Sequence, residues 1–138
     1  MKILVTGVNG QLGHDVMNEL AARGHDGSGS GLEEKYSGED KYSAVSHMPY
    51  VSMNITDEKR VAEVISSCHP DAVIHCAAWT SVDAAEDADK RALVKNINVD
   101  GTQYIANACQ KNGCKMMYIS TDYVFDGQGA EPWQPDCK

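Results

Sequence analysis

Three glycines that separate a short apolar run from an amphipathic helix constrain the fold of this chain most strongly. Residues 3–5 (Ile-Leu-Val) are continuously apolar, as in a strand buried on both faces of a sheet. Gly7, Gly10 and Gly13 follow directly, and Gly24 provides a stop for the helix. The apolar residues of that helix recur at helical spacing: Leu12, Val16, Met17, Leu20 and Ala21. This order predicts the first strand–turn–helix unit of a parallel α/β sheet.

The same three glycines favour the binding of an anion. Gly7 can adopt a tight turn, Gly10 lets the backbone approach a ligand, and Gly13 lets the helix pack closely on the strand. The start of the helix offers unpaired N–H groups and a partial positive charge. We therefore expect the pyrophosphate of a dinucleotide here, and the alternative is a tight turn that holds no ligand.

Beyond Gly24, strands and helices continue to alternate. Residues 25–31, 50–55, 72–76 and 115–120 are predicted strands, although 25–31 (His-Asp-Gly-Ser-Gly-Ser-Gly) is a poor strand former. Residues 32–49 and 127–138 lack periodicity, and we expect them to be irregular. The alternation predicts an α/β fold, a Rossmann-type doubly wound parallel sheet with right-handed crossovers.

Two further helices are predicted between these strands. Thr56 is expected to cap the first, with Asp57 and Glu58 in its first turn. Its apolar face comprises Val61, Val64, Ile65 and Cys68. The second is a long helix that Asn112-Gly113 ends, and its apolar face comprises Val94, Ile97, Gly101, Ile105 and Ala108. Asn98 is unfavourable within this helix, so it either holds a backbone kink or a water, or is an ordinary exposed residue.

The charges and the metal-binding residue types argue against several kinds of partner. Asp and Glu outnumber Lys and Arg by 20 to 12 without a basic cluster, so we expect no nucleic acid. No apolar run approaches the length of a membrane span and no leader is recognisable, so we expect no membrane and a cytoplasmic location. The cysteines and histidines lack metal-ligand spacing, so we expect Cys76 and Cys109 to be core residues and the histidines to be satisfied or exposed. Four acids invite a magnesium interpretation, but we assign them to the first turns of a helix and expect no metal: Asp83, Glu86, Asp87 and Asp89.

Small and polar residues follow two of the predicted strands. Ala77 and Ala78 come after 72–76, and Ser120, Thr121 and Asp122 end 115–120. Ligands of open α/β sheets bind at the carboxyl ends of the strands, where small side chains let a flat ring or a ribose approach. Ordinary packing is the alternative for the alanines, and a turn or cap is the alternative for Ser-Thr-Asp.

The glycine spacing and four other stretches carry a resemblance to a known family. Two residues separate neighbouring glycines, which gives Gly-x-x-Gly-x-x-Gly preceded by Thr6. The other stretches are 54–57 (Asn-Ile-Thr-Asp), 75–83 (His-Cys-Ala-Ala-Trp-Thr-Ser-Val-Asp), 96–102 (Asn-Ile-Asn-Val-Asp-Gly-Thr) and 118–127 (Tyr-Ile-Ser-Thr-Asp-Tyr-Val-Phe-Asp-Gly). Over nearly its whole length the chain resembles the dTDP-4-dehydrorhamnose reductase family, in the extended branch of the short-chain dehydrogenase/reductase superfamily.

The resemblance implies an oxidoreductase that transfers hydride from NADPH or NADH to a nucleotide-linked 4-keto-6-deoxysugar, toward dTDP-L-rhamnose. It implies these cofactor-binding residues: Gly7, Asn9, Gly10, Gln11, Leu12, Gly13, Asn54, Ile55, Ala77, Ala78, Trp79, Thr80 and Ile119. It places the substrate on Val82, Thr121 and Asp122, with Thr121 as the catalytic hydroxyl that hydrogen-bonds the carbonyl oxygen. A nucleotide sugar is the implied partner, and a homodimer is one arrangement that it allows.

The chain departs from the family pattern in three places. No tyrosine has a lysine four residues later, so the proton donor of a Tyr-x-x-x-Lys pair is missing. The family places that pair and the substrate domain later in the chain, so we expect 1–138 to be an incomplete NAD(P)-binding Rossmann domain, inactive alone. Gly31 stands where an acid normally binds the ribose of NAD; Glu33 could substitute, and no arginine is ready for a 2′-phosphate. His75 replaces the usual asparagine.

Two alternatives to a reductase stay open on the sequence. A non-catalytic NADP-binding subunit, such as the regulatory subunit of methionine adenosyltransferase, would show the same resemblance. An epimerase or dehydratase of the extended branch would use the same cofactor half. The sequence does not decide between NAD and NADP, nor does it identify the sugar.

Overall fold

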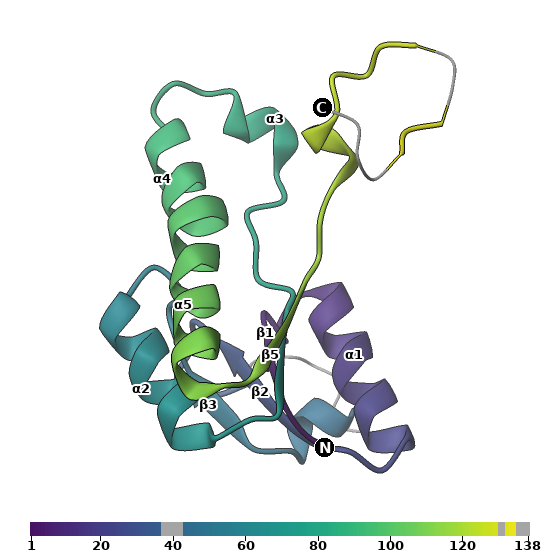
Figure 1. Ribbon diagram of the computed structural model, residues 1–138, viewed down its shortest axis with the longest axis vertical. Helices are drawn as coiled ribbons and strands as arrows, with labels where there is room; N and C mark the ends of the chain where they lie inside the picture. Colours follow the sequence, from purple (N-terminus) through teal and green to yellow (C-terminus); the bar gives the residue numbers. More distant parts are fainter. Residues whose placement is uncertain (37–42, 130–131, 135–138) are drawn as a thin grey trace.

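Five parallel strands form one sheet in the computed structural model, which describes residues 1–36, 43–129 and 132–134 (Figure 1). The strands lie in the order β3-β2-β1-β4-β5. Their bounds are β1 Lys2–Thr6, β2 Asp26–Gly31, β3 Tyr50–Ser52, β4 Ala72–His75 and β5 Lys115–Tyr118. The order reverses direction between β1 and β4, and ligands of doubly wound sheets bind at this point, beyond the carboxyl ends. The predicted Rossmann-type sheet is therefore confirmed.

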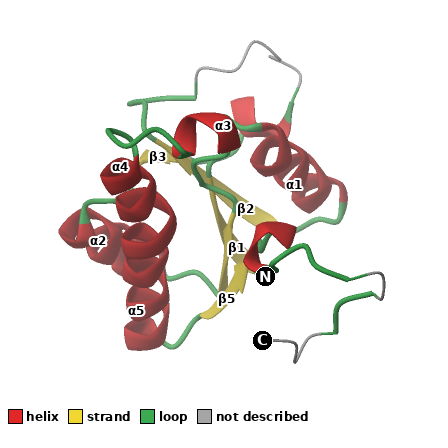
Figure 2. Ribbon diagram, turned by 90° about the horizontal axis from the view of Figure 1, so that it is seen from above, coloured by secondary structure: helices red, strands yellow, loops and turns green. Residues whose placement is uncertain are grey.

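Helices cover both faces of the sheet (Figure 2). Helix α1 (Gln11–Ala22) and the 3₁₀ turn η1 (Ala44–Ser46) lie on one face, and α2 (Glu58–Cys68) and α5 (Thr102–Asn112) lie on the other. Two apolar clusters fill the space between the layers, one around Met17 and Val8 beneath α1 and one around Ile65 and Ile105 beneath α2 and α5. The predicted apolar faces of α2 and α5 are confirmed. In α1, Met17 and Leu20 are buried, but Leu12 and Ala21, which the sequence predicts on the same face, are exposed.

Strand β2 forms although its sequence is DGSGSG. Its glycines leave room for neighbouring side chains: a Cβ at Gly29 would lie 3.0 Å from Cγ2 of Val8, and one at Gly27 would displace the end of the Met48 side chain. Pairing with β1 on one side and β3 on the other supplies the hydrogen bonds of the strand. Tertiary pairing therefore overrides the low intrinsic β propensity of this segment.

Three predicted strands end earlier than expected. β3 ends at Ser52 because Asn54 begins a turn, in which its Oδ1 accepts hydrogen bonds from Thr56 N (3.0 Å) and the Thr56 hydroxyl (2.9 Å). β4 stops at His75 and β5 at Tyr118. The prediction that Thr56 caps α2 is wrong. Asp57 is the cap, and its Oδ1 accepts from the N–H of Arg60 at 3.0 Å, whereas Thr56 is held by Asn54.

The predicted long helix is not one regular α-helix. Helix α4 (Arg91–Lys95) continues through a wider π-helical turn, η2 (Asn96–Gly101), into α5. Gly101 lies against Ile55, where an added Cβ would come within 3.0 Å of Cγ1. Gly113 ends α5 with a φ of +68°, as Asn112-Gly113 predicts.

The acids before α4 are arranged differently from the prediction. Only Asp83 lies in the first turn of a helix, the short α3 (Val82–Ala85). Glu86 follows the end of α3, and Asp87 and Asp89 lie in the turn before α4. Across the described residues, no three or more His, Cys, Asp or Glu side chains are grouped to hold a metal ion.

The cysteines that the structure describes are unpaired, as expected: Cys68, Cys76, Cys109 and Cys114. Cys109 lies in the core, and burial raises the pKa of its thiol to about 12, with Cys114 adding to the rise. Burial also raises the pKa of the Cys76 thiol. In the described ranges, no helix is both long and apolar enough to cross a bilayer.

Candidate functional site

The glycine-rich turn packs directly on the segment that follows β4. Gly7 has a φ of +72°, and a Cβ there would lie 2.8 Å from the backbone N and Cα of Ala77. A Cβ on Gly13 would overlap the carbonyl group of Gly7, so α1 can begin this close to β1 only with glycine at that position. The conformational roles predicted for Gly7 and Gly13 are confirmed, and both glycines bring the turn onto the end of β4.

The open side of the turn suits an anion. Gly10 is the N-cap of α1, and its N–H donates to the carbonyl of Gly7 at 3.0 Å. A Cβ at Gly10 would find only that carbonyl oxygen within 4 Å among the described atoms, so this side of the backbone is accessible. No described side chain caps α1, and Gln11 and Leu12 at its start are exposed. The free N–H groups of a helix start, without an acid in the first turn, fit a pyrophosphate.

Two side chains hold the segment after β4 in place. The hydroxyl of Thr6 accepts hydrogen bonds from Cys76 N (3.2 Å) and Ala77 N (3.1 Å). The amide of Asn98 pairs with Trp79 in both directions, accepting from its N–H at 2.8 Å and donating to its carbonyl at 3.1 Å. Asn98 is half-buried, so it is not an ordinary exposed residue. It holds the backbone of the segment after β4 rather than a kink in its own helix. Ala78 and Thr80 stay exposed between these anchors, on the side available to a ligand.

His75 connects the two anchors beneath the site. Its side chain is 1% exposed, with Nδ1 2.7 Å from the Thr6 hydroxyl oxygen and Nε2 3.2 Å from that of Thr102. Because Thr6 already accepts two N–H groups, its hydrogen goes to Nδ1, and Nε2–H donates to Thr102. Thr102 in turn donates to the carbonyl of Asn98 at 2.9 Å. Burial lowers the pKa of His75 to about 4, so the ring is neutral at neutral pH.

The sequence predicts that His75 is either satisfied or exposed; the structure shows that it is satisfied, by partners that the sequence does not reveal. The signal for His75 is its place in a strand of otherwise apolar residues, followed by two alanines. Thr6 and Thr102 carry no pattern that distinguishes them from other threonines. Their role depends on β1, β4 and α5 meeting at one point, which sequence spacing does not reveal.

The residues after β3 split between surface and core. Asn54 is exposed, and its side-chain oxygen Oδ1 already accepts two hydrogen bonds from Thr56. The side chain of Ile55 is 6% exposed, belongs to the core cluster and packs on Gly101. Only the backbone of Ile55 is therefore available to a cofactor.

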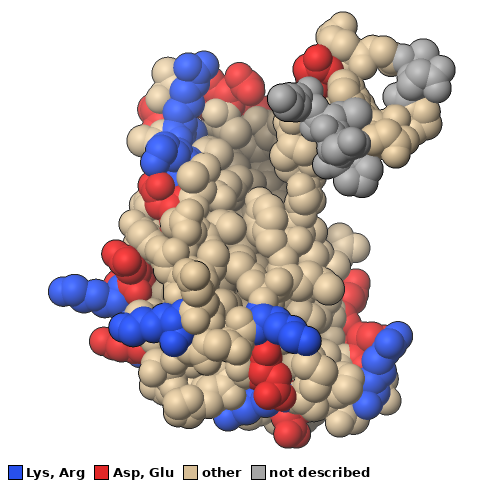
Figure 3. All heavy atoms as spheres, in the orientation of Figure 1, with Lys and Arg blue, Asp and Glu red and all other residues tan. Residues whose placement is uncertain are grey.

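The predicted substrate residues lie on two segments beyond the carboxyl ends of the strands (Figure 1). Val82 begins α3 and is 42% exposed. Ile119, which is predicted to bind the cofactor, follows β5 and is 40% exposed. The hydroxyl of Thr121 accepts from Tyr123 N and donates to Oδ1 of Asp122, both at 3.2 Å. Thr121 is therefore the cap of the 3₁₀ turn η3 (Asp122–Val124), which is the local role that Ser-Thr-Asp also predicts. In the view of Figure 3, charged residues lie along the left side and across the lower part of the molecule, and the middle of the surface above them carries few charges.

The third contact of the glycine-rich turn is with the end of β2. The side-chain amide of Asn9 donates a short hydrogen bond to Oε2 of Glu33. The hydroxyl of Tyr50 donates to the backbone carbonyl of Glu33 at 3.0 Å. Glu33 therefore lies beside the turn, two residues after the position where the acid of this fold is usually found.

Comparison with known proteins identifies the family. A sequence model described as the RmlD substrate binding domain matches residues 1–138. The chain belongs to this family. The resemblance to dTDP-4-dehydrorhamnose reductases is confirmed by relatives of that name.

Relatives of this RmlD-family chain include curated reductases. The dTDP-4-dehydrorhamnose reductase of Streptomyces griseus is 34% identical over 133 residues, which are 96% of this chain and 37% of that protein. The spore coat polysaccharide biosynthesis protein SpsK of Bacillus subtilis is also 34% identical, over 98% of this chain and 41% of its own length. The chain therefore spans about two fifths of the curated relatives that it matches.

Solved structures agree with the RmlD assignment. A dTDP-4-dehydrorhamnose reductase from Bacillus anthracis, solved in complex with NADP, is 36% identical with a TM-score of 0.70, over 91% of this chain and 38% of that one. A UDP-glucose 4-epimerase from Thermus thermophilus, in complex with NAD, is 27% identical with a TM-score of 0.76, over 95% and 42%. A UDP-glucose 4-epimerase from Stenotrophomonas maltophilia, at 24% identity and a TM-score of 0.79 over 96% and 40%, shares the fold.

Proposed function

We propose that these residues are the cofactor-binding part of an NAD(P)H-dependent reductase that acts on a nucleotide-linked 4-keto-6-deoxysugar. The observation that carries the proposal is the uncapped start of α1, held by Gly7 against the segment of Ala77 at the switch point of the sheet. The names of the relatives support the substrate class, and the NADP and NAD complexes of related structures support the cofactor. A cytoplasmic location, a homodimeric state and the incomplete domain at 1–138 are parts of the same proposal.

The residues would act as follows. Gly10 and the first N–H groups of α1 hold the pyrophosphate, and the exposed Ala78 and Thr80 line the path toward the end of β4. When bound, NAD(P)H supplies the hydride. The hydroxyl of Thr121 turns from Asp122 to the substrate carbonyl oxygen and stabilises the charge that develops there, while Val82 and Asp122 contact the sugar.

A non-catalytic NADP-binding subunit is the second candidate. One observation favours it: the hydroxyl of Thr121 is engaged in a local cap, where it accepts from the N–H of Tyr123. Both candidates need the same cofactor site, so cofactor binding alone does not separate them. Turnover with a dTDP-4-keto-6-deoxysugar, measured on the protein encoded by the whole gene, does.

The cofactor site is tested by calorimetry with NADH and NADPH on the 138-residue chain. We expect binding by the wild type and its loss in Gly10→Val, because a β-branched side chain blocks the approach of the pyrophosphate. Ser66→Val adds the same side chain to an exposed position on α2 and serves as the matched control. Equal affinity in the wild type and Gly10→Val would contradict the assignment.

A further inference from the structure

The position of the usual ribose-binding acid is occupied by glycine in this chain, and two polar side chains crowd it. Gly31 ends β2, and a Cβ there would lie 2.7 Å from the hydroxyl oxygen of Tyr50 and 3.0 Å from Nδ2 of Asn9. Both atoms are the ends of side chains, so an aspartate or glutamate at this position would have to displace the side chains of Tyr50 and Asn9. The space in which its carboxylate would start is already filled by two polar groups.

Those same two groups position Glu33. Asn9 donates to its carboxylate and Tyr50 to its backbone carbonyl, while the hydroxyl of Ser52 donates to the carbonyl of Leu32 at 3.2 Å. The segment after β2 is thus fixed at two successive carbonyl groups. Asn9 lies between Gly7 and Gly10, so the Glu33 carboxylate is held against the turn that would carry the pyrophosphate.

The contacts of Glu33 leave its negative charge in place. Asn9 is a neutral donor, so it orients the carboxylate without cancelling its charge. Burial raises the pKa of the Tyr50 phenol, the hydrogen bond with Asn9 opposes the rise, and the charge on Glu33 adds to it, so the phenol remains a neutral donor too.

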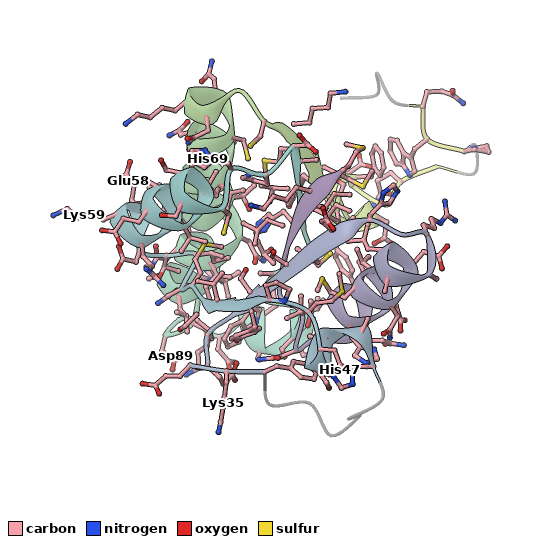
Figure 4. The ribbon with its side chains drawn as sticks, turned by 90° about the horizontal axis from the view of Figure 1, so that it is seen from below. Lys35, His47, Glu58, Lys59, His69 and Asp89 are labelled. Carbon is pink, nitrogen blue, oxygen red and sulfur yellow. The ribbon has the colours of Figure 1, made fainter. Side chains whose placement is uncertain are left out.

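Within residues 1–36 and 43–129, the basic residues near this edge are directed elsewhere. Arg60 donates from two nitrogens to the carbonyl of Ser52, at 3.1 and 3.0 Å, and lies 3.6 Å from Glu63. Lys35 extends outward from the molecule (Figure 4). A 2′-phosphate placed at the end of β2 would therefore meet a carboxylate beside the turn.

We propose that Glu33 selects NAD(H) over NADP(H) by accepting hydrogen bonds from the ribose hydroxyls of the adenosine and repelling a 2′-phosphate. This rests on the proposed cofactor site. Glu33, which Asn9 and Tyr50 hold beside the glycine-rich turn, would then perform the role that an acid at position 31 usually performs.

The experiment measures dissociation constants for NADH and NADPH at low salt with three proteins: wild type, Glu33→Gln and Glu34→Gln. We expect the wild type to prefer NADH by about tenfold or more, because placing like charges side by side is unfavourable. Glu33→Gln should narrow this ratio severalfold, mainly by tighter NADPH binding. Glu34→Gln removes the same charge from the next exposed residue and should leave the ratio near that of the wild type. Raising the salt concentration should narrow the wild-type ratio through screening.

The outcomes distinguish this inference from the proposed function. An unchanged ratio in Glu33→Gln, or a wild type that binds NADPH as tightly as NADH, would overturn the role of Glu33 while leaving the cofactor site intact. Failure of both nucleotides to bind would overturn the cofactor site and this inference with it. A narrowed ratio in both glutamine variants would assign the effect to the general negative charge of the segment.

Discussion

The hydroxyl oxygen of Thr6 lies 2.7 Å from Nδ1 of His75, and together these two side chains connect the end of β1 to the end of β4. Thr6 also holds the N–H groups of Cys76 and Ala77, and His75 reaches Thr102 at the start of α5. The wall of the candidate site is therefore anchored from below by a buried, neutral imidazole.

Acid should weaken the fold through His75. Its pKa is lowered to about 4 in the folded chain from 6.5, so the unfolded state binds more protons between these values. The contribution of the neutral His75 to the free energy of unfolding should therefore be complete above about pH 6.5. It should be lost as the pH drops toward 4, which lowers the free energy of unfolding by about 3 kcal/mol in total. Urea unfolding at a series of pH values measures this slope.

His75→Asn should flatten that slope relative to the wild type. His69→Asn is the control, since His69 is exposed at the end of α2 with a φ of +44°, a conformation that asparagine tolerates (Figure 4). If His75→Asn retains the wild-type slope, the buried imidazole is not the group that titrates.

Thr6→Val should destabilise the chain more than Thr102→Val does. Valine keeps the shape of threonine, but at position 6 it leaves two N–H groups and Nδ1 of His75 without their partner. Each buried polar group left unsatisfied costs about 1–3 kcal/mol. Thr102→Val removes one acceptor and one donor. Chemical denaturation ranks the two variants, and the reverse order would show that Thr6 is not the principal anchor.

Gly31→Asp should destabilise the protein without strengthening NADH binding. The new Cβ displaces the ends of the Tyr50 and Asn9 side chains and so disturbs the hydrogen bonds that they donate to Glu33. The loss of one such bond typically costs about 0.5–1.5 kcal/mol. Leu32→Asp places the same acid on the next residue, which is 69% exposed, and should cost less. A stable Gly31→Asp variant with improved NADH affinity would show that the space at the end of β2 is free.

Thr121→Val should reduce kcat in the protein encoded by the whole gene, provided that the proposed reductase activity holds. Loss of one hydrogen-bond donor to a developing oxyanion costs about a hundred- to a thousandfold in kcat, while cofactor affinity should change little. The variant also removes the cap of η3, which costs about 1 kcal/mol of local stability. Near-normal kcat would leave Thr121 with its capping role alone.

The sequence predicts the layers of this fold because each layer has a local signal. The apolar run of β1, the glycine-rich turn and the periodic faces of α1 and α2 are visible within about a dozen residues each. β2 is predictable only from its place in the alternation, since glycines that make room for Val8 and Met48 look like a loop in the sequence.

The candidate site is less predictable because its contacts join distant segments. Residues 69 apart make the hydrogen bond from Thr6 to His75, and residues 24 apart bring Asn9 to Glu33. The sequence predicts Thr56 rather than Asp57 as the cap because both residue types favour that position, and Asn54, which holds Thr56, decides between them only in the folded chain. The sequence shows that Gly31 replaces the acid that is usual at this position, but only the structure shows that Tyr50 and Asn9 lie against it.

The π-helical turn at Asn96–Gly101 makes the chain sensitive to the loss of one residue. A wide turn of this kind contains one residue more than a regular α-helical turn, and each residue rotates the helix by about 100°. Deleting Val99, which is 56% exposed, would let the helix run on regularly above Ile105 and swing Asn98 away from Trp79. The buried face of α5 would stay packed on the sheet, whereas α4 and the residues around Asn98 would be rotated to face a new direction. The extra residue in this turn thus sets the rotation of α4 and Asn98, which hold the segment after β4, relative to α5, which packs against the core.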